Sequence, residues 1–232
     1  MDSRILYSKA FAMVEIKLQK QESVVAEKGS MSAMRGNARI KTSIGGTHKG
    51  ILGYIISLFA AILRRLFGGE SIFMNTYTAM DDNGLVLYAS PASIGDITEQ
   101  ELIDQELTFR KGAFLAATPG VRIKTVWGGI RTLLGGAGLT LLKATGTGVL
   151  WLNAEGGIEE IMVMDSYTVD TGHVLSFGDG LKLTNRTAGG VKTTLFGSEL
   201  MVARFSGQGK LLIQSHTEEN LIQRVIEYLP DV

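Results

Sequence analysis

The stretch Gly29-Ser-Met-Ser-Ala-Met-Arg-Gly-Asn-Ala-Arg-Ile-Lys-Thr-Ser-Ile-Gly-Gly46 recurs twice more, in altered form, along this chain of 232 residues. The second copy is Gly112-Ala-Phe-Leu-Ala-Ala-Thr-Pro-Gly-Val-Arg-Ile-Lys-Thr-Val-Trp-Gly-Gly129, and direct alignment gives 8 identities in 18 positions. The third copy, Gly172-His-Val-Leu-Ser-Phe-Gly-Asp-Gly-Leu-Lys-Leu-Thr-Asn-Arg-Thr-Ala-Gly-Gly190, is one residue longer. A periodic sequence is built from one supersecondary unit used repeatedly, so the copies predict a body of three similar units.

Each copy contributes the same parts in the same order. A first strand leads to the glycine at position 29, 112 or 172, and the next strand carries Arg39, Arg122 or Lys182 before a double glycine. A Phe-Gly or Leu-Gly step follows, and a glycine turn such as Asp82-Asn-Gly84 opens the last hairpin of the unit. Such sequences are strong turn signals, so we interpret these glycines as turn residues between strands.

Alternating apolar and polar residues predict half-buried strands. In the segment 10–19 the apolar face consists of Ala12, Val14, Ile16 and Leu18, and the polar face of Glu15, Lys17 and Gln19. Short strands are also expected after glycine turns, at Gly84–Ala89, Gly148–Asn153 and Gly209–Gln214. The chain is therefore predicted to be all-β.

Composition limits the possible functions. Glycine is enriched, at 29 residues, whereas proline is rare and 45% of residues are hydrophobic, which indicates turns in a β protein rather than disorder. The 23 basic residues balance the 23 acidic ones, so long-range attraction to polyanions or membranes is not favoured. The absence of cysteine excludes disulfides and thiolate chemistry and is compatible with a cytoplasmic location, which we expect. Residues 1–11 lack the pattern of a secretory signal.

Two segments depart from the β pattern. The apolar run Ile51–Leu63, followed by Arg64 and Arg65, predicts a short helix near 51–66. Thirteen helical residues span about 20 Å, less than a bilayer core. We therefore expect a helix buried in the body or at a subunit contact, with a peripheral membrane contact as the alternative. At the C-terminus, Thr217 can cap an amphipathic helix over 217–229 that is expected to dock.

Phosphate-binding loops are not supported by the glycine runs. The run Gly207–Lys210 lacks the hydroxyl residue after its lysine, and Gly135–Gly138 lies between strands rather than at the start of a helix. No serine lies in a nucleophile elbow and no carboxylate pair stands out. We therefore expect no enzymatic activity and no cofactor.

The three histidines, His48, His173 and His216, show no metal-ligand spacing, so no metal site is expected. His173 follows Asp170 closely in sequence. We interpret His173 as a structural residue that bonds to Asp170 or to a main-chain carbonyl.

One group of polar residues recurs with the repeat. Arg39, Arg122 and Lys182 occupy the same position in the three copies, and Lys41 and Lys124 follow two residues later. Residues two apart on a strand share a face, so these side chains could form a repeated anion site, for phosphate or nucleic acid. The alternative is an ordinary solvated strand face, which the neutral net charge favours.

Several motifs together resemble a known family. They are the segment 68–73 (Gly-Gly-Glu-Ser-Ile-Phe), the run Val169–His173, the Gly-Gly-x-Lys-Thr-x-x-Phe-Gly pattern from Gly189 to Gly197, and Gln214-Ser215. In this order they are similar to the altered-inheritance-of-mitochondria biogenesis family, whose members occur in bacteria and archaea as well as mitochondria. The resemblance implies a fold like the tryptophan RNA-binding attenuation protein, with short β-sandwich units of the double-stranded β-helix type. It also implies three units per chain, a homotrimer that closes a ring, and no catalytic residues.

Together these observations predict one body with repeats over about 10–100, 101–161 and 162–216, and a terminal helix over 217–232. We expect a non-enzymatic, ring-forming scaffold or binding protein of unknown ligand. The alternatives are nucleic-acid or anion binding through the repeated basic residues, and a membrane-associated organising protein.

Overall fold

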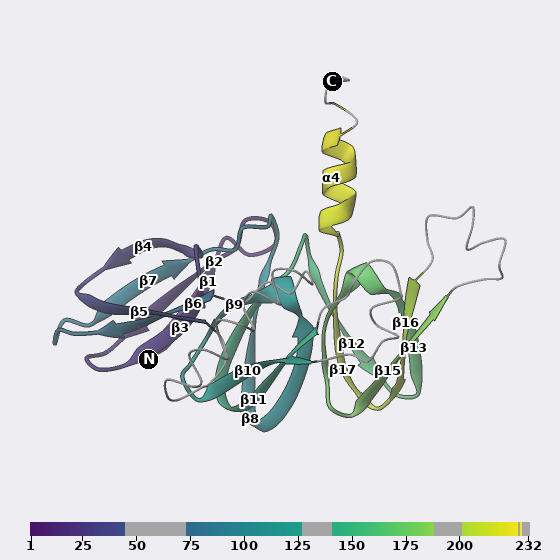
Figure 1. Cartoon of the computed structure of the whole chain (residues 1–232), viewed down its shortest axis with the longest axis horizontal. Coiled ribbons are helices and arrows are strands. Elements are labelled where there is room, and N and C mark those ends of the chain that lie inside the picture. Colours follow the sequence, from purple (N-terminus) through teal and green to yellow (C-terminus); the bar gives the residue numbers. More distant parts are fainter. Residues whose placement is uncertain (45–72, 127–140, 188–200, 227, 229–232) are drawn as a thin grey trace, which may run out of the picture.

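The computed structural model describes residues 1–44, 73–126, 141–187, 201–226 and 228 (Figure 1). Antiparallel β-strands dominate this part of the chain, which confirms the all-β prediction. The one α-helix among the described residues is α4 (Glu218–Ile226), and two single 3-10 turns, η1 (Lys111–Ala113) and η2 (Thr171–His173), each follow a strand. The apolar run Ile51–Leu63 and the double glycines lie outside the described residues.

The strands form three successive units. The first comprises β1 (Asp2–Leu6), β2 (Met13–Leu18), β3 (Ser23–Glu27), β4 (Met31–Arg35), β5 (Ala38–Ile44), β6 (Phe73–Ala79) and β7 (Leu85–Ala89). The second comprises β8 (Ile97–Arg110), β9 (Phe114–Ala117), β10 (Val121–Val126) and β11 (Leu141–Asn153). The third comprises β12 (Ile158–Val163), β13 (Ser166–Asp170), β14 (Val174–Gly178), β15 (Leu181–Thr187), β16 (Met201–Gly207) and β17 (Gly209–Gln214).

The same strand pairings recur in every unit. In the first, β7 pairs with β2 and β4, and β6 pairs with β3 and β5. In the third, β17 pairs with β12 and β14, and β16 pairs with β13 and β15. The second unit makes these pairings with the long strands β8 and β11, which change direction at Asp104 (φ 51°) and between Gly146 and Gly148. The pairings thus recur along the chain, while the triplication and the likeness to the RNA-binding attenuation protein stay predictions.

Neighbouring units are joined by one antiparallel strand pair with a constant register. At the first joint β9 pairs with β3, which places Ala116 opposite Ala26 and Ala117 opposite Val25. At the second joint β14 pairs with β8, which places Ser176 opposite Phe109. In the aligned units Ser176 corresponds to Ala116 and Phe109 to Ala26, so both joints use the same register. Each joint fuses half of one unit with half of the next into a composite sheet.

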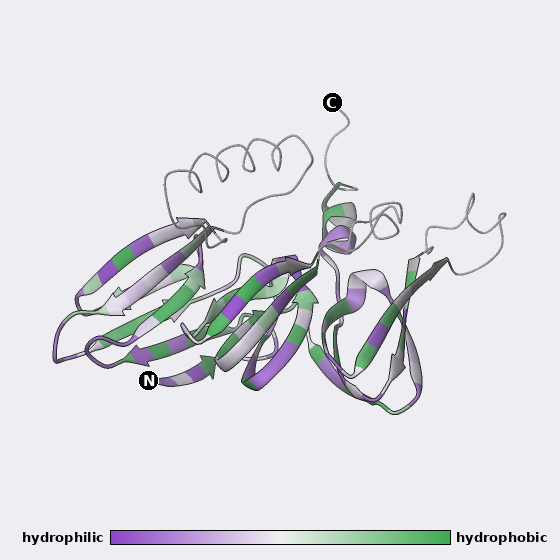
Figure 2. Ribbon diagram, turned by 60° about the horizontal axis from the view of Figure 1, so that its bottom comes forward, coloured by the Kyte–Doolittle hydropathy of each residue, from purple (hydrophilic) through white to green (hydrophobic). Residues whose placement is uncertain are grey.

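Each joint also completes a hydrophobic core. Leu115 and Trp151 of the second unit pack into the core cluster of the first, and Leu175 and Leu212 of the third pack into that of the second. The Trp151 indole donates a hydrogen bond to Glu99, 2.8 Å away. Hydrophobic and hydrophilic residues alternate along many of these strands (Figure 2), as expected where one strand face packs on a core. The predicted apolar face of the segment 10–19 is confirmed as buried.

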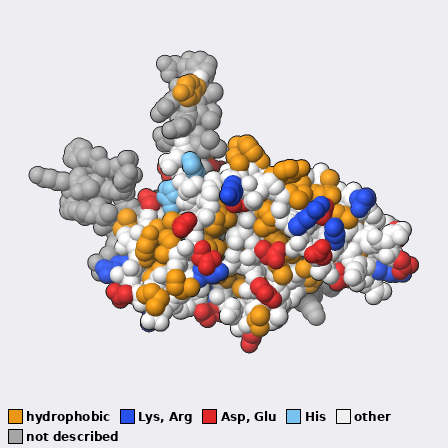
Figure 3. Space-filling model, turned by 180° about the vertical axis from the view of Figure 1, so that it is seen from behind, with side chains coloured by type: hydrophobic (Ala, Val, Ile, Leu, Met, Phe, Trp, Pro, Cys, Tyr) orange, Lys and Arg blue, Asp and Glu red, His pale blue; other side chains and the backbone are white. Residues whose placement is uncertain are grey.

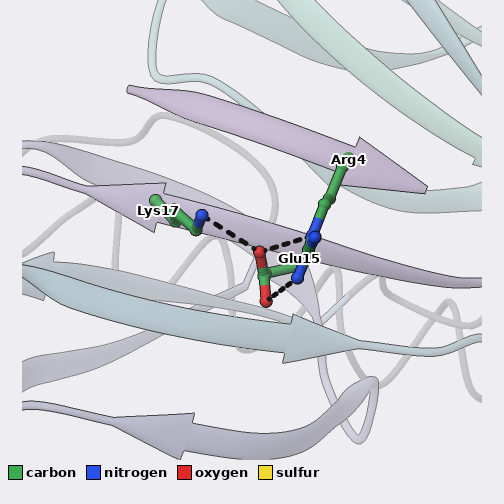
Figure 4. A network of polar contacts seen from close by, with 3 residues as sticks. All are labelled: Arg4, Glu15 and Lys17. Atoms are coloured by element: carbon green, nitrogen blue, oxygen red, sulfur yellow. Dashed lines mark hydrogen bonds and ion pairs between the residues drawn. The ribbon is translucent and has the colours of Figure 1, made fainter. Parts of the chain in front are cut away.

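The predicted polar face is wrong for one residue, Glu15, which is only 3% exposed. The reason is β1, which pairs with β2 and brings Arg4 onto the carboxylate (Figure 4). The Arg4 Nε donates to Glu15 Oε1 at 2.8 Å, and Lys17 Nζ lies 3.4 Å from the same oxygen. Hydrogen bonds from the Tyr88 hydroxyl and then from Arg4 lower the pKa of Glu15 to about 2.

The C-terminal helix forms as predicted, but it does not dock on its own body. The Asn220 N–H donates to Thr217 Oγ1 at 3.2 Å, which is the predicted cap. Beyond it, α4 stands away from the strands (Figure 1), and Ile222 and Ile226 are exposed. No helix among the described residues is long and apolar enough to cross a membrane. A membrane contact through Ile51–Leu63 stays a prediction.

We predict that Glu15→Gln lowers the thermal stability at pH 7 and flattens its acid dependence. The folded Glu15 pKa, about 2, lies below the ordinary value of 4.5, so the folded chain binds this proton less tightly than the unfolded chain. The stabilisation is therefore present above pH 4.5 and is lost as the pH falls toward 2. Melting followed by circular dichroism at pH 7, 4 and 2.5 tests this. Parallel melting-temperature profiles for both proteins would contradict it.

A second prediction concerns Glu27, at the end of β3 beside the first joint, where burial raises the pKa to about 7. Here the folded chain binds the proton more tightly, so stability is full below pH 4.5 and falls as the pH rises through 7. Glu27→Gln should therefore increase the free energy of unfolding at pH 8 by about 2 kcal/mol and change little at pH 4. Urea denaturation at both pH values measures this; an equal effect at both would contradict it.

Candidate functional site

The two ends of the row of units carry unpaired strand edges. The strand β4 lies at one end of the molecule and β13 at the other (Figure 1). Within the described residues, β4 pairs only with β7, and β13 pairs only with β16. At both internal joints the corresponding strands are paired on both sides. The outer edges of β4 and β13 therefore display main-chain N–H and C=O groups without a strand partner among the described residues. The equivalent groups at the inner joints are hydrogen-bonded to a neighbouring strand.

Side-chain burial distinguishes β4 sharply from its counterparts. All five β4 residues are exposed, whereas all four residues of β9 are buried, as are the first four of β14. Met34 is 37% exposed and takes the position of Ala117 and Phe177, both buried. The strand β13 is largely exposed too, apart from a half-buried Val169. Both strands occupy the positions of joint strands, but among the described residues each is paired on one side alone.

The five predicted basic residues are all exposed and lie on strands that, within the described ranges, each pair with a single neighbour. Arg39 and Lys41 are on β5, Arg122 and Lys124 are on β10, and Lys182 is on β15. None of them is part of an ion pair between described residues. Arg39, Arg122 and Lys182 lie opposite Thr78, Thr145 and Ser206, respectively. Each unit thus presents a cation across from a hydroxyl group.

The sequence interpretation missed two cations beside this row. Lys143 on β11 lies opposite Lys124, and Arg204 on β16 lies opposite Thr184. Both stand three residues before a turn glycine (Gly146 and Gly207), so aligning the units on their turns, rather than on the basic strand, would have found them. Lys143 is partly neutralised by Glu106, whose Oε2 is 2.6 Å from its Nζ. The basic positions are therefore repeated and exposed, but acidic groups accompany them.

The face seen in Figure 3, which is the back of the view in Figure 1, shows no single dominant charge. Acidic and basic side chains are interspersed among hydrophobic ones, and histidines lie at the foot of the projecting helix (Figure 3). His173 has the predicted structural role, since its Nδ1 is 2.7 Å from the main-chain oxygen of Gln214. Asp170 instead accepts from the Gly172 N–H. Among the described residues, no group of three or more His, Asp or Glu side chains could hold a metal ion.

Comparison with known proteins places this architecture in a family. Residues 3–216 match the family described as mitochondrial biogenesis AIM24. The chain is 30% identical over 226 residues to an uncharacterised protein of Streptococcus pyogenes serotype M6, an alignment that covers 96% of this chain and 89% of the relative. An X-ray crystal structure of a Streptococcus pyogenes protein superposes with a TM-score of 0.77 at 27% identity, and covers 98% of this chain and 100% of its own. The chain thus belongs to the mitochondrial biogenesis AIM24 family.

Proposed function

We propose that this protein is a non-enzymatic scaffold that assembles into a closed ring by pairing β4 of one copy with β13 of the next. The observation that carries this proposal is the complete exposure of β4, whose counterparts β9 and β14 are buried at inner joints. A joint between copies would be head-to-tail, and such heterologous contacts close into rings when the rotation allows it. Three copies, as the sequence resemblance implies, would make a homotrimer.

The internal joints predict the register between copies. Val169 corresponds to Phe109 and Ala26, and Ala33 corresponds to Ser176 and Ala116. Val169 of one copy should therefore lie opposite Ala33 of the next. By the same alignment Thr168 should lie opposite Met34.

The third core cluster supports the same neighbour. The first two clusters contain buried side chains from the following unit, such as Leu115 and Trp151 in the first and Leu175 and Leu212 in the second. Among the described residues, the third cluster contains none from beyond the third unit. The residues that correspond to Leu115 and Trp151 in the first unit are Ser32 and Tyr88. In a ring, these side chains of the next copy would cover the third core. The ligand of such a ring and its cytoplasmic location stay predictions.

We predict that Met34→Asp converts the assembly into monomers. Met34 is exposed in the single chain, so the chain should fold, but the carboxylate would be desolvated without a partner in the ring, at a cost of about 3–5 kcal/mol per joint. The association constant should fall at least about 100-fold. Light scattering should give three times the chain mass of 25.0 kDa for the parent protein and one chain mass for the variant.

The matched control is Ile103→Asp, which changes an apolar, exposed side chain on β8, away from β4 and β13. It should leave the mass of the assembly unchanged. A parent protein that is monomeric under light scattering, or a Met34→Asp variant that assembles as the parent does, would refute the ring.

A second candidate function is binding of phosphate-rich polyanions, such as nucleic acid. The observation in its favour is the cation-and-hydroxyl pair repeated in each unit, at Arg39, Arg122 and Lys182. A ring would present these pairs on every unit, and phosphate contacts from separate units add to the affinity. The neutral net charge and the Lys143–Glu106 ion pair act against it.

If this second function operates, replacing Arg39, Arg122 and Lys182 together by alanine should weaken binding to single-stranded RNA by at least about tenfold and reduce its salt dependence. The control replaces Lys9, Lys20 and Lys210, which removes the same charge from other surfaces. Fluorescence anisotropy at two salt concentrations measures both. Equal binding by the parent and the triple variant would rule out this candidate.

A further inference from the structure

We propose that helix α4 of one copy packs its apolar face on the exposed loop Tyr7–Phe11 of the next copy in the ring. This inference rests on the proposed ring and names a second contact between the same two copies. It assigns a partner to a helix that stands off its own body (Figure 1).

The first argument comes from main-chain hydrogen bonds along the rim that links the units. Ala12 N–H donates to Gly95 O at 3.0 Å, and Asp96 N–H donates to Gly156 O at 2.9 Å. Ala12 directly precedes β2, and Asp96 directly precedes β8. The N–H of each donates a hydrogen bond to the residue that lies two positions before the first strand of the next unit. In the third unit the corresponding residue is Gly157, whose N–H donates to Ser215 Oγ at 2.8 Å instead of to a following unit. The residue of the next copy that corresponds to Gly95 and Gly156 is Phe11.

The tail of the chain reaches the same place. Ser215 N–H donates to Gly157 O at 2.9 Å, just as Ala154 N–H donates to Asp96 O at 2.9 Å. These bonds make Ser215 the counterpart of Ala154, so Thr217, two residues later, is the counterpart of Gly156. Helix α4 therefore begins at the position where a further unit would begin its first strand. The start of α4 and Phe11 of the next copy therefore converge on one position of the rim, and α4 must leave the sheet there.

The two segments have complementary surfaces. Tyr7 and Phe11 are 74% and 70% exposed, and Ile222 and Ile226 are 47% and 57% exposed. Residues four apart share a helix face, so these isoleucines form one apolar stripe. Hydrophobic side chains also lie on the rim beside the foot of the helix (Figure 3).

Charge favours the same pairing. Lys9 lies between the two aromatic residues and is exposed, while Glu218 and Glu219 occupy the first turn of α4. Burial of aromatic side chains against isoleucine, with a lysine facing two carboxylates, gives the contact both affinity and orientation.

Cysteine crosslinking can test this contact cleanly, because the chain contains no cysteine. A Phe11→Cys chain and an Ile222→Cys chain are coexpressed, assembled and oxidised. Because the two cysteines reside on separate chains, only a contact between copies can join them. We expect a disulfide-linked dimer on non-reducing gels, on the order of tenfold more abundant than in the control. The control pairs Ile222→Cys with Ile103→Cys, an exposed residue on β8.

The outcomes separate the two proposals. A ring of normal mass without the Phe11–Ile222 disulfide would overturn this contact and leave the ring standing. A disulfide that forms only when both cysteines are on one chain would place the helix on its own body and also overturn the contact. A monomeric parent protein would overturn the ring and this contact with it.

Discussion

Hydrogen bonding at strand edges is the constraint on which this structure depends. Each unit contributes half of one sheet and half of another, and only the next unit supplies the missing strands. The pairs β3–β9 and β8–β14 meet this need twice within the chain, with the same register each time. In the proposed ring the same need arises at the ends of the chain, and the edges of β4 and β13 are the two halves of that joint.

The internal joints and the proposed joint between copies differ in polarity. Within the chain, each joint places apolar side chains, such as Leu115 and Trp151, in the core of the preceding unit. At the corresponding positions in the first unit stand Ser32 and Tyr88, and Tyr88 is bonded to the Arg4–Glu15 pair. A more polar edge keeps a newly made chain soluble and lowers the chance of indiscriminate strand pairing. The closing joint can therefore be specific without being as apolar as a core.

The sequence predicts much of this fold, because alternation and turn glycines are local signals. Burial of Val14 and Ile16, the strand Gly209–Gln214 and the Thr217 cap followed from residues close together in the chain. Burial of Glu15 did not, because it depends on β1 folding back and on Arg4. The position of Lys143 opposite Lys124 could not be predicted either, because it depends on the register between β10 and β11. The helix pattern predicted α4 correctly but could not show that α4 projects away from the strands.

The central claim is that the outer edge of β4 is hydrogen-bonded to β13 of another copy. Amide hydrogen exchange, resolved to single residues by NMR or mass spectrometry, tests it in the unmodified protein. We expect that amides of Ser32–Met34 are protected to the same degree as those of β9, and that amides of Thr168 and Val169 are protected with them. Exchange of both strands at the rate of a free edge, in protein whose β9 amides stay protected, would contradict it.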